Sequence, residues 1–333
     1  MRNGFTVSNT LRWGIIGTGL IADLFVTDLL ANGHVVTAVG SRTQGAADAF
    51  AAKFGIANAH DSYEALVADP EVDVVYVATP HPFHHANATL ALEAGKHVLV
   101  EKAFTINAAD AASIVELAAS RNLVVLEAMW TRFLPHMVRL RELIAEGVIG
   151  DVRTVIADHN QNLPQDPSHR LQDPALGGGA LLDLGIYPIS FAHDILGVPS
   201  TISAIAAKTA TGVDRQTAVV LGYADGQQAL VHTALDTAGP NSASVIGTNG
   251  WVAIDKVFYE PTSFTVYALD GSVVERYESS VSNRGMQFQA AELERLVGAG
   301  LLAGDILSPD ETVAIMATLD EIRSQIGLSY PGE

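Results

Sequence analysis

The chain has 333 residues, 48% of them hydrophobic and 17% charged, a composition typical of a globular protein of about two domains. Its 19 basic and 37 acidic residues give a net charge of −18, which argues against nucleic acid and anionic membrane as partners. Cysteine is absent, which excludes disulfides, thiolate catalysis and sulfur-ligated metals. We expect a cytoplasmic protein, because the polar first ten residues show no signal-peptide pattern and no apolar run is long enough to span a membrane.

Short apolar runs alternate with helical patterns over the first 129 residues. Strands are predicted at 11–16, 35–39, 72–77, 97–100 and 124–127, and helices at 20–30, 46–54, 63–68, 86–94 and 108–121. Continuous apolar strands separated by helices indicate a parallel sheet covered on both faces. The first 129 residues therefore form a doubly wound α/β domain, whose ligands bind at the carboxyl ends of the strands.

The first strand leads into a glycine turn, Gly17-Thr18-Gly19-Leu20-Ile21-Ala22, which opens the first helix. Gly17 permits a tight turn, Gly19 lets the backbone approach a phosphate, and Ala22 is small enough to pack helix against strand. The N–H groups at the helix start point toward the anion. This pattern predicts a Rossmann site for a dinucleotide, with Leu20 and Ile21 also at the cofactor.

The second half, residues 130–333, has a different pattern. After a helix at 135–146, the dipeptides Asp225-Gly226, Asn249-Gly250 and Asp270-Gly271 each separate two candidate strands, as hairpin turns do. We expect an α+β domain with a largely antiparallel open sheet. Strands 217–221 and 229–235 are apolar or small on both faces, which favours a homodimer through this sheet, although a covering loop would give the same pattern. Ser308-Pro309 starts a last helix that ends near residue 327.

The second strand ends in Gly40-Ser41-Arg42 with no carboxylate. An NAD site places an acid there for the ribose hydroxyl, whereas a 2′-phosphate favours a hydroxyl and a guanidinium. Ser41 and Arg42 therefore favour NADP, with NAD still possible. Arg42 could instead be a surface residue or stack on the adenine of either cofactor.

Three further segments carry polar groups: Thr79-Pro80-His81-Pro82-Phe83-His84, Glu101-Lys102, and Gly177-Gly178-Gly179 followed by Asp183 and Tyr187. Together with the glycine turn, these segments resemble the Gfo/Idh/MocA family of NAD(P)-dependent oxidoreductases. The resemblance covers nearly the whole chain, from Leu11 to the last helix. The segment from Glu127 to Phe133 is similar to the branch that holds dimeric dihydrodiol dehydrogenases and NADP-dependent D-xylose dehydrogenases.

This resemblance implies an enzyme that moves a hydride between NADP and a hydroxyl or carbonyl group of a sugar, polyol or cyclic diol. Tyr187 would be the general acid/base, Lys102 would stabilise charge on the reacting oxygen, and Asp183 would orient the site or contact substrate hydroxyls. By spacing alone, Asp183 and Tyr187 share one helix face, although Pro188 disturbs the helix there. Each of the three residues also has a purely structural interpretation. Lys102 could be a surface lysine at a strand end, Tyr187 a core tyrosine, and Asp183 an acid that favours a helix start.

The resemblance also assigns cofactor contacts to Thr79, Pro80, His81, His84, Glu101, Lys102, Trp130 and Arg132. Trp130 could equally be a core residue. No metal is expected, because His81, His84 and His85 show no zinc-protease pairing with a glutamate, and the resemblance implies hydride transfer that needs no metal.

The family motif usually reads Glu-Lys-Pro, and Ala103 takes the place of the proline here. The sequence leaves open whether the Lys102–Ala103 bond is cis or trans. Ala103 is also the one feature that favours the alternative function, a non-catalytic regulatory protein that binds NADP or a sugar.

Overall fold

The computed structural model describes residues 11–333; the first ten residues, on which the signal-peptide expectation rests, lie outside the described part. The chain divides into two compact units. Unit 1 holds the residues up to Thr105, Ala109–Trp130 and Arg284–Thr312; unit 2 holds Ile106–Ala108, Thr131–Asn283 and Val313–Glu333. The sequence analysis drew a single boundary after residue 129. In the structure, residues 284–312 belong to unit 1. There the Glu294 carboxylate accepts a 2.8 Å hydrogen bond from the Trp13 indole.

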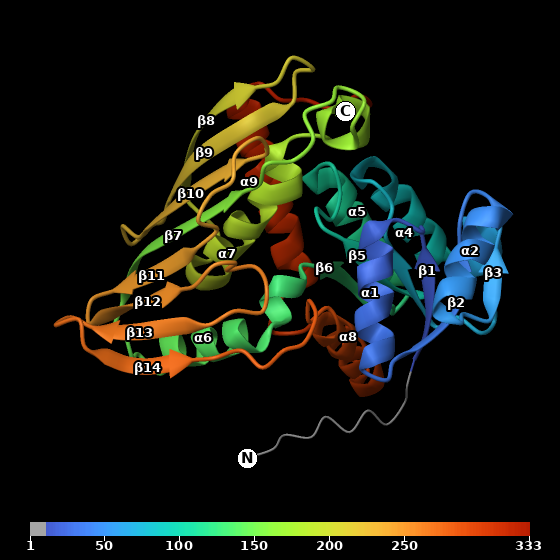
Figure 1. Cartoon of the computed structure of the whole chain (residues 1–333), viewed down its shortest axis with the longest axis horizontal. Coiled ribbons are helices and arrows are strands. Elements are labelled where there is room, and N and C mark those ends of the chain that lie inside the picture. Colours follow the sequence, from blue (N-terminus) through green and yellow to red (C-terminus); the bar gives the residue numbers. More distant parts are fainter. Residues whose placement is uncertain (1–10) are drawn as a thin grey trace. The chain divides into compact units, whose positions relative to one another are not determined.

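Unit 1 contains a six-stranded parallel sheet in the order β3-β2-β1-β4-β5-β6 (Figure 1). Its strands are β1 Arg12–Ile16, β2 Val35–Gly40, β3 Asn58–His60, β4 Val74–Val77, β5 His97–Glu101 and β6 Val125–Ala128. Its helices are α1 Leu20–Ala31, α2 Gln44–Phe54, α3 Tyr63–Val67, α4 His84–Glu93, α5 Ala108–Ser120 and α8 Gln287–Ala299. The prediction of a doubly wound parallel sheet is confirmed. Strand β3, only three residues long, and helix α8 were not predicted.

The strand order explains where a ligand can bind in unit 1. Strands β1, β2 and β3 run outward in one direction and β4, β5 and β6 in the other, so the order reverses between β1 and β4. Right-handed crossovers then place the connecting helices on opposite faces of the two halves. In doubly wound sheets, dinucleotides bind at such a reversal, at the carboxyl ends of the strands.

Unit 2 contains an eight-stranded sheet in the order β14-β13-β12-β11-β7-β10-β9-β8. Its strands are β7 Val152–Asn160, β8 Thr201–Lys208, β9 Asp214–Gly222, β10 Gln228–Ala234, β11 Ala243–Gly247, β12 Gly250–Ile254, β13 Phe264–Ala268 and β14 Val273–Tyr277. Every neighbouring pair is antiparallel except β7 and β10. The largely antiparallel sheet and its three hairpins are as predicted.

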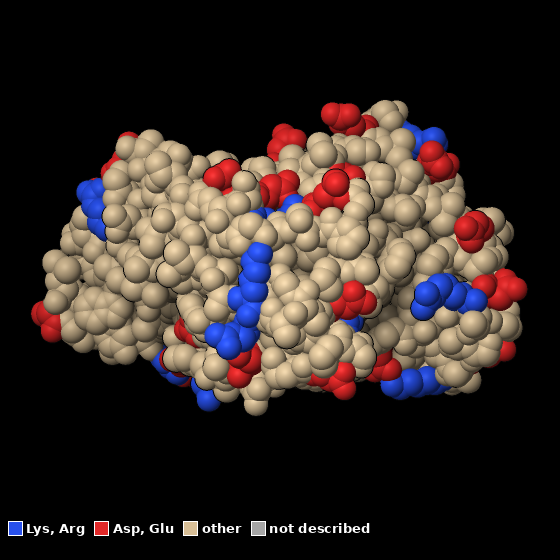
Figure 2. All heavy atoms as spheres, turned by 90° about the horizontal axis from the view of Figure 1, so that it is seen from above, with Lys and Arg blue, Asp and Glu red and all other residues tan. Residues whose placement is uncertain are grey.

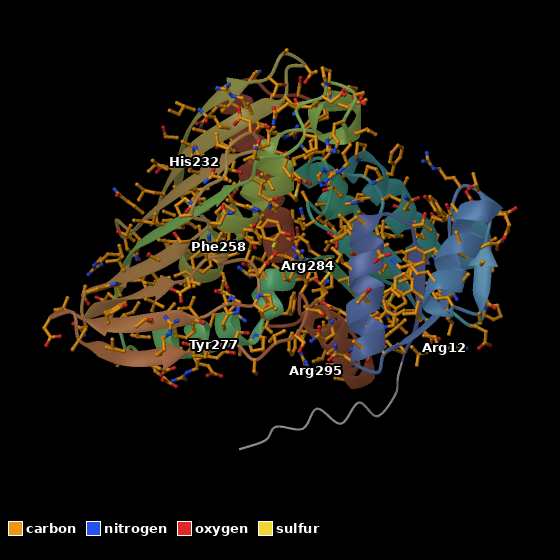
Figure 3. The ribbon with its side chains drawn as sticks, viewed as in Figure 1. Arg12, His232, Phe258, Tyr277, Arg284 and Arg295 are labelled. Carbon is orange, nitrogen blue, oxygen red and sulfur yellow. The ribbon has the colours of Figure 1, made fainter. Side chains whose placement is uncertain are left out.

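Helices cover one face of this sheet. Figure 1 shows α6 Pro135–Ala145, α7 Ile186–Leu196 and α9 Pro309–Ile326 on the same side of the strands. Phe258 is fully buried there and packs against Phe191 of α7, with ring centroids 5.8 Å apart (Figure 3). Ser308 accepts a 3.1 Å hydrogen bond from the Glu311 N–H, so the predicted serine cap of the last helix is present.

The opposite face of the sheet, which we call the outer sheet face, carries exposed apolar side chains. They are Ile156, Ile205, Val220, Leu230 and Ile246, each between 36% and 75% exposed. Leu230 of β10 pairs in register with Ile156 on one side and Val220 on the other, so these side chains form one row across three strands. Figure 2 shows few charged side chains at the left of the view, where the strands of this sheet lie.

The segment Pro174–Leu196 has the length and the mean hydropathy, 1.3, of a membrane span, contrary to the sequence expectation that no run does. However, 89% of its most apolar stretch is buried inside the structure. The core helix of a globular unit has the same apolar composition, because it is covered by protein on all sides.

Candidate active site

The glycine turn after β1 has the shape that a dinucleotide pyrophosphate needs. Gly17 has a φ of +103°, and a Cβ there would lie 2.9 Å from the carbonyl oxygen of Ala78. Around Gly19, in contrast, a Cβ would meet no atom within 4 Å. Gly19 precedes α1, and no side chain caps that helix start. Open space in front of backbone N–H groups at a helix start fits a phosphate group.

An aromatic stack and a hydrogen bond connect α1, through β4, with the end of β5 directly before Lys102. Phe25 of α1 stacks on Tyr76 of β4, with ring centroids 3.9 Å apart. The Tyr76 hydroxyl donates a hydrogen bond to the buried Glu101 carboxylate, which also accepts the Lys102 N–H at 3.2 Å. Glu101 therefore holds the backbone of Lys102 at the end of β5. That Glu101 also contacts the cofactor stays a prediction.

His84 connects the loops that follow β4 and β5. Its ring is fully buried, with Nε2 2.6 Å from the Thr79 carbonyl oxygen and Nδ1 3.0 Å from that of Ala103. Burial lowers the pKa of His84, and the carbonyl contacts offset part of that effect. The bond between Lys102 and Ala103, left open by the sequence, is cis. The His84 ring thus holds the backbone at Thr79, after β4, and at Ala103, after β5, next to residues predicted to contact the nicotinamide.

The remaining cofactor residues predicted in unit 1 also lie at the carboxyl ends of the strands. His81 is buried, with its ring edge-on to His84 at 5.6 Å. Ser41 follows β2 and donates its N–H to the His60 carbonyl at 3.1 Å. Trp130 follows β6, is 1% exposed, and lies under the Arg284 guanidinium at 5.2 Å (Figure 3). Their contact with a cofactor stays a prediction.

Arg42 is exposed and lies two residues after the end of β2, where a residue that contacts the adenosine ribose would lie. Burial raises the pKa of the Tyr63 hydroxyl, and the positive charge of Arg42 offsets part of this rise. The residues between β2 and α2, Ser41, Arg42 and Thr43, include no carboxylate to bond a ribose hydroxyl.

Unit 2 carries Asp183 and Tyr187 on a continuous helical segment whose first part is not an α-helix. Leu181–Gly185 is a π-helical turn, and α7 begins at Ile186. Because a π-turn is wider than an α-turn, the i,i+4 spacing on which the sequence analysis relied does not describe this segment. The Asp183 carboxylate makes a 3.1 Å ion pair with Arg170.

Pro188 explains the role of a histidine that the sequence analysis missed. Proline has no N–H, so it cannot donate to the Leu184 carbonyl four residues earlier. That carbonyl lies 3.1 Å from Nδ1 of His159, a buried residue of β7. Since a carbonyl only accepts, Nδ1 carries the proton. Nε2 of the neutral ring then accepts from the Gln161 side chain at 2.8 Å.

His159 is part of an aromatic cluster with Tyr187 and Tyr259. Its ring stacks on Tyr259 at 3.8 Å and meets Tyr187 edge-on at 5.0 Å. Gln161 also donates to the Tyr259 hydroxyl at 3.2 Å. The residues around Tyr187 come from β7 and from the loop after β12, and no local motif in the sequence marks them.

Arg132 lies in unit 2 and is 3% exposed. Its guanidinium donates to the Ser190 carbonyl at 2.8 Å and pairs with Asp194 at 3.4 Å. These contacts join the start of α6 to α7 in the core of the unit. The predicted contact of Arg132 with the cofactor is not tested by this arrangement. Among residues 11–333, no group of three His, Cys, Asp or Glu side chains is arranged to hold a metal ion.

Unit 1 has a Rossmann sheet, a glycine turn that fits a phosphate group and a lysine directly after β5, and unit 2 has an open sheet and carries a tyrosine and an aspartate. Together these features indicate a nicotinamide-dependent oxidoreductase. Comparison with known families agrees. Residues 11–129 match the oxidoreductase family model with the NAD-binding Rossmann fold, and residues 137–253 match the GFO/IDH/MocA C-terminal domain. The chain belongs to the GFO/IDH/MocA family of oxidoreductases.

Individual relatives are similar over nearly the whole chain. Trans-1,2-dihydrobenzene-1,2-diol dehydrogenase of Bos taurus is 36% identical, covering 96% of this chain and 98% of its own. D-xylose 1-dehydrogenase (NADP(+)) of Hypocrea jecorina is 35% identical, covering 97% and 93%. Among solved structures, the 3-ketoreductase KijD10 from Actinomadura kijaniata, in complex with NADP and TDP-benzene, superposes with a TM-score of 0.85 at 26% identity, covering 96% and 98%.

Proposed function

We propose that this protein is an NADP-dependent dehydrogenase that acts on a hydroxyl group of a sugar, polyol or cyclic diol, or on the corresponding carbonyl group. The observation that carries the proposal is the glycine turn, open in front of α1, in the same unit as Lys102 at the end of β5. Relatives named as diol and xylose dehydrogenases support the substrate class.

The proposed chemistry assigns one task to each polar residue. Bound nicotinamide supplies the acceptor or donor of the hydride. Tyr187 takes the hydroxyl proton during oxidation and returns it during reduction. Lys102 stabilises negative charge on the reacting oxygen, and Asp183 accepts a hydrogen bond from a substrate hydroxyl. The ion pair with Arg170 holds one oxygen of the Asp183 carboxylate.

The proposal of NADP rests on the end of β2. Arg42 offers a planar set of donors and a full positive charge, which suit a 2′-phosphate. Ser41 adds a hydroxyl beside it, and the residues between β2 and α2, Ser41 to Thr43, include no acid that would repel the phosphate. The relative from Hypocrea jecorina carries NADP(+) in its name, and KijD10 was solved with NADP.

A substrate panel tests the proposal. Purified protein is incubated with NADP and, in turn, with pentoses, hexoses and dihydrodiols, while the absorbance of the reduced cofactor is followed. We expect turnover with at least one of them, and a lower rate with NAD. Tight binding of NADP without turnover of any substrate would contradict the dehydrogenase and favour the regulatory alternative.

We also propose a homodimer formed through the outer sheet face. The row of Ile156, Val220 and Leu230 exposes contiguous apolar surface on a sheet face that none of the helices α6, α7 and α9 covers (Figure 1). His232, two residues along β10 from Leu230, lies on the same face (Figure 3). A two-fold axis would pack this face against its copy. We also propose a cytoplasmic location, as expected from the sequence.

A further inference from the structure

The turn Gly177-Gly178-Gly179 precedes the segment that carries Asp183 and Tyr187, and contacts within unit 2 hold its backbone. The Gly179 N–H donates to the Leu171 carbonyl at 2.9 Å. The Gly178 carbonyl accepts from the Tyr330 hydroxyl at 2.8 Å. Asp183 and Tyr187 follow within two turns of helix, so a displacement of this turn would displace both of them.

Asp214, the first residue of β9, occupies the space next to this turn. It is fully buried, and its Oδ2 accepts two hydrogen bonds of 2.8 Å, one from the Leu181 N–H and one from the Thr217 hydroxyl. Its Oδ1 lies 2.1 Å from where a Cβ of Gly179 would stand, and Gly179 has a φ of +119°. Only glycine leaves room for the carboxylate at this point.

A buried carboxylate at this position is costly unless its contacts offset the cost. Burial raises the pKa of Asp214 to about 7, while the donors Thr217 and Leu181 act in the opposite direction. The carboxylate also satisfies an N–H group at the start of the helical segment, which has no partner within the helix itself. One of its two hydrogen bonds therefore holds the backbone that leads into the segment of Asp183 and Tyr187.

We propose that Asp214 is a positioning residue for the reaction. By fixing the backbone at Leu181, it sets the positions of the Asp183 carboxylate and the Tyr187 hydroxyl, although it touches neither substrate nor cofactor. The inference rests on the proposed function, in which Tyr187 transfers the proton.

The substitution Asp214→Asn tests this inference, because it keeps the shape of the side chain, removes its charge, and puts an amide NH2 group either at Oδ2, which accepts both hydrogen bonds, or at Oδ1, against Gly179. We expect kcat to fall about 10- to 100-fold, as a misplaced acid/base would cause, with the Kd for NADP unchanged. Asp28→Asn is the matched control. Asp28 is also buried, accepts the Met286 N–H at 2.8 Å, and belongs to unit 1. Its variant should keep the wild-type kcat.

Hydrogen exchange separates a failure of this inference from a failure of the proposed function, because it needs no turnover. Peptides over residues 177–190 should exchange faster in Asp214→Asn than in wild type, while the rest of the chain is unchanged. Thr217→Val, which removes one partner of Asp214, should show the same changes to a smaller degree, and it serves if Asp214→Asn does not fold. Wild-type kcat, or unchanged exchange over 177–190, would overturn the inference.

Discussion

His84 reaches the backbone directly after Lys102: its Nδ1 lies 3.0 Å from the carbonyl oxygen of Ala103, while its Nε2 lies 2.6 Å from that of Thr79. One buried ring thus connects the ends of two neighbouring strands. The geometry of Lys102 therefore depends on a residue that does not itself need to touch the substrate.

Replacing His84 with phenylalanine should break this connection. The variant keeps a ring of similar size but removes the ring N–H, so a buried carbonyl oxygen loses its donor, which costs about 1–3 kcal/mol of unfolding free energy. We expect a lower kcat as well, because Lys102 loses its support. Denaturant unfolding and steady-state kinetics measure the two effects. His85→Phe, at the neighbouring and less buried histidine, should change neither.

Tyr187→Phe should abolish most of the turnover. Loss of the hydroxyl removes the proposed acid/base, so kcat should fall by about 10²–10⁴ while the Kd for NADP stays the same. Tyr223→Phe is a suitable control, since Tyr223 is also buried in unit 2 and its hydroxyl has no hydrogen-bond partner among the described residues. An active Tyr187 variant would refute the assigned role.

Arg42→Ala should change cofactor preference. A hydrogen-bonded ion pair with a 2′-phosphate is worth about 1.5–3 kcal/mol, so the Kd for NADP should rise about 10- to 100-fold. The Kd for NAD should be unchanged, because NAD has no phosphate there. Fluorescence titration measures both constants. Equal weakening of NADP and NAD would point instead to stacking on adenine.

Two buried histidines of unit 2 should make the protein less stable in acid. Burial lowers the pKa of His136 and of His193 to about 4, below the value of 6.5 in an unfolded chain. Between those values the unfolded chain binds a proton that the folded state does not, so the unfolding free energy falls as pH drops from 6.5 to 4. Each histidine contributes up to about 3 kcal/mol to this loss.

The variant with both His136→Gln and His193→Gln measures that contribution. Its unfolding free energy, followed by urea titration at pH 7 and pH 4.5, should decrease less than that of the wild type. Asp214 acts in the opposite sense, since its pKa is raised to about 7, but it is present in both proteins. An identical decrease in the two proteins would contradict the assignment.

A charge on the outer sheet face should separate the proposed dimer. Leu230→Glu places a carboxylate beside Ile156 and Val220, and burying it against a second copy would be unfavourable. Sedimentation equilibrium should then give the monomer mass of 35.1 kDa. Val198→Glu is the control, because Val198 is 65% exposed in a loop outside the sheet. A wild-type monomer would dismiss the dimer.

The sequence predicted those features that depend on neighbouring residues. The glycine turn at Gly17, the turn at Asp225-Gly226 and the cap at Ser308 each encode their own conformation through backbone preferences, and all three were placed correctly. Sheet order could not be derived this way. The parallel pairing of β7 with β10 joins residues more than 70 positions apart, and no local pattern specifies it.

The candidate site shows the same difference between local and distant residues. Lys102 and Tyr187 stand in recognisable motifs, whereas His159 became visible only through the carbonyl that Pro188 leaves without an N–H donor. The π-turn at Leu181–Gly185 was also missed, because its residues have the composition of an ordinary apolar helix.

Because residues 284–312 belong to unit 1, the two units are hard to recombine with units of other proteins. The chain passes from one unit to the other after residues 105, 108, 130, 283 and 312, so neither unit is a single stretch of sequence. A gene fusion with a single junction therefore cannot exchange unit 2 whole while keeping unit 1 whole. A truncated clone of either unit as one stretch of sequence would lack part of that unit's own core.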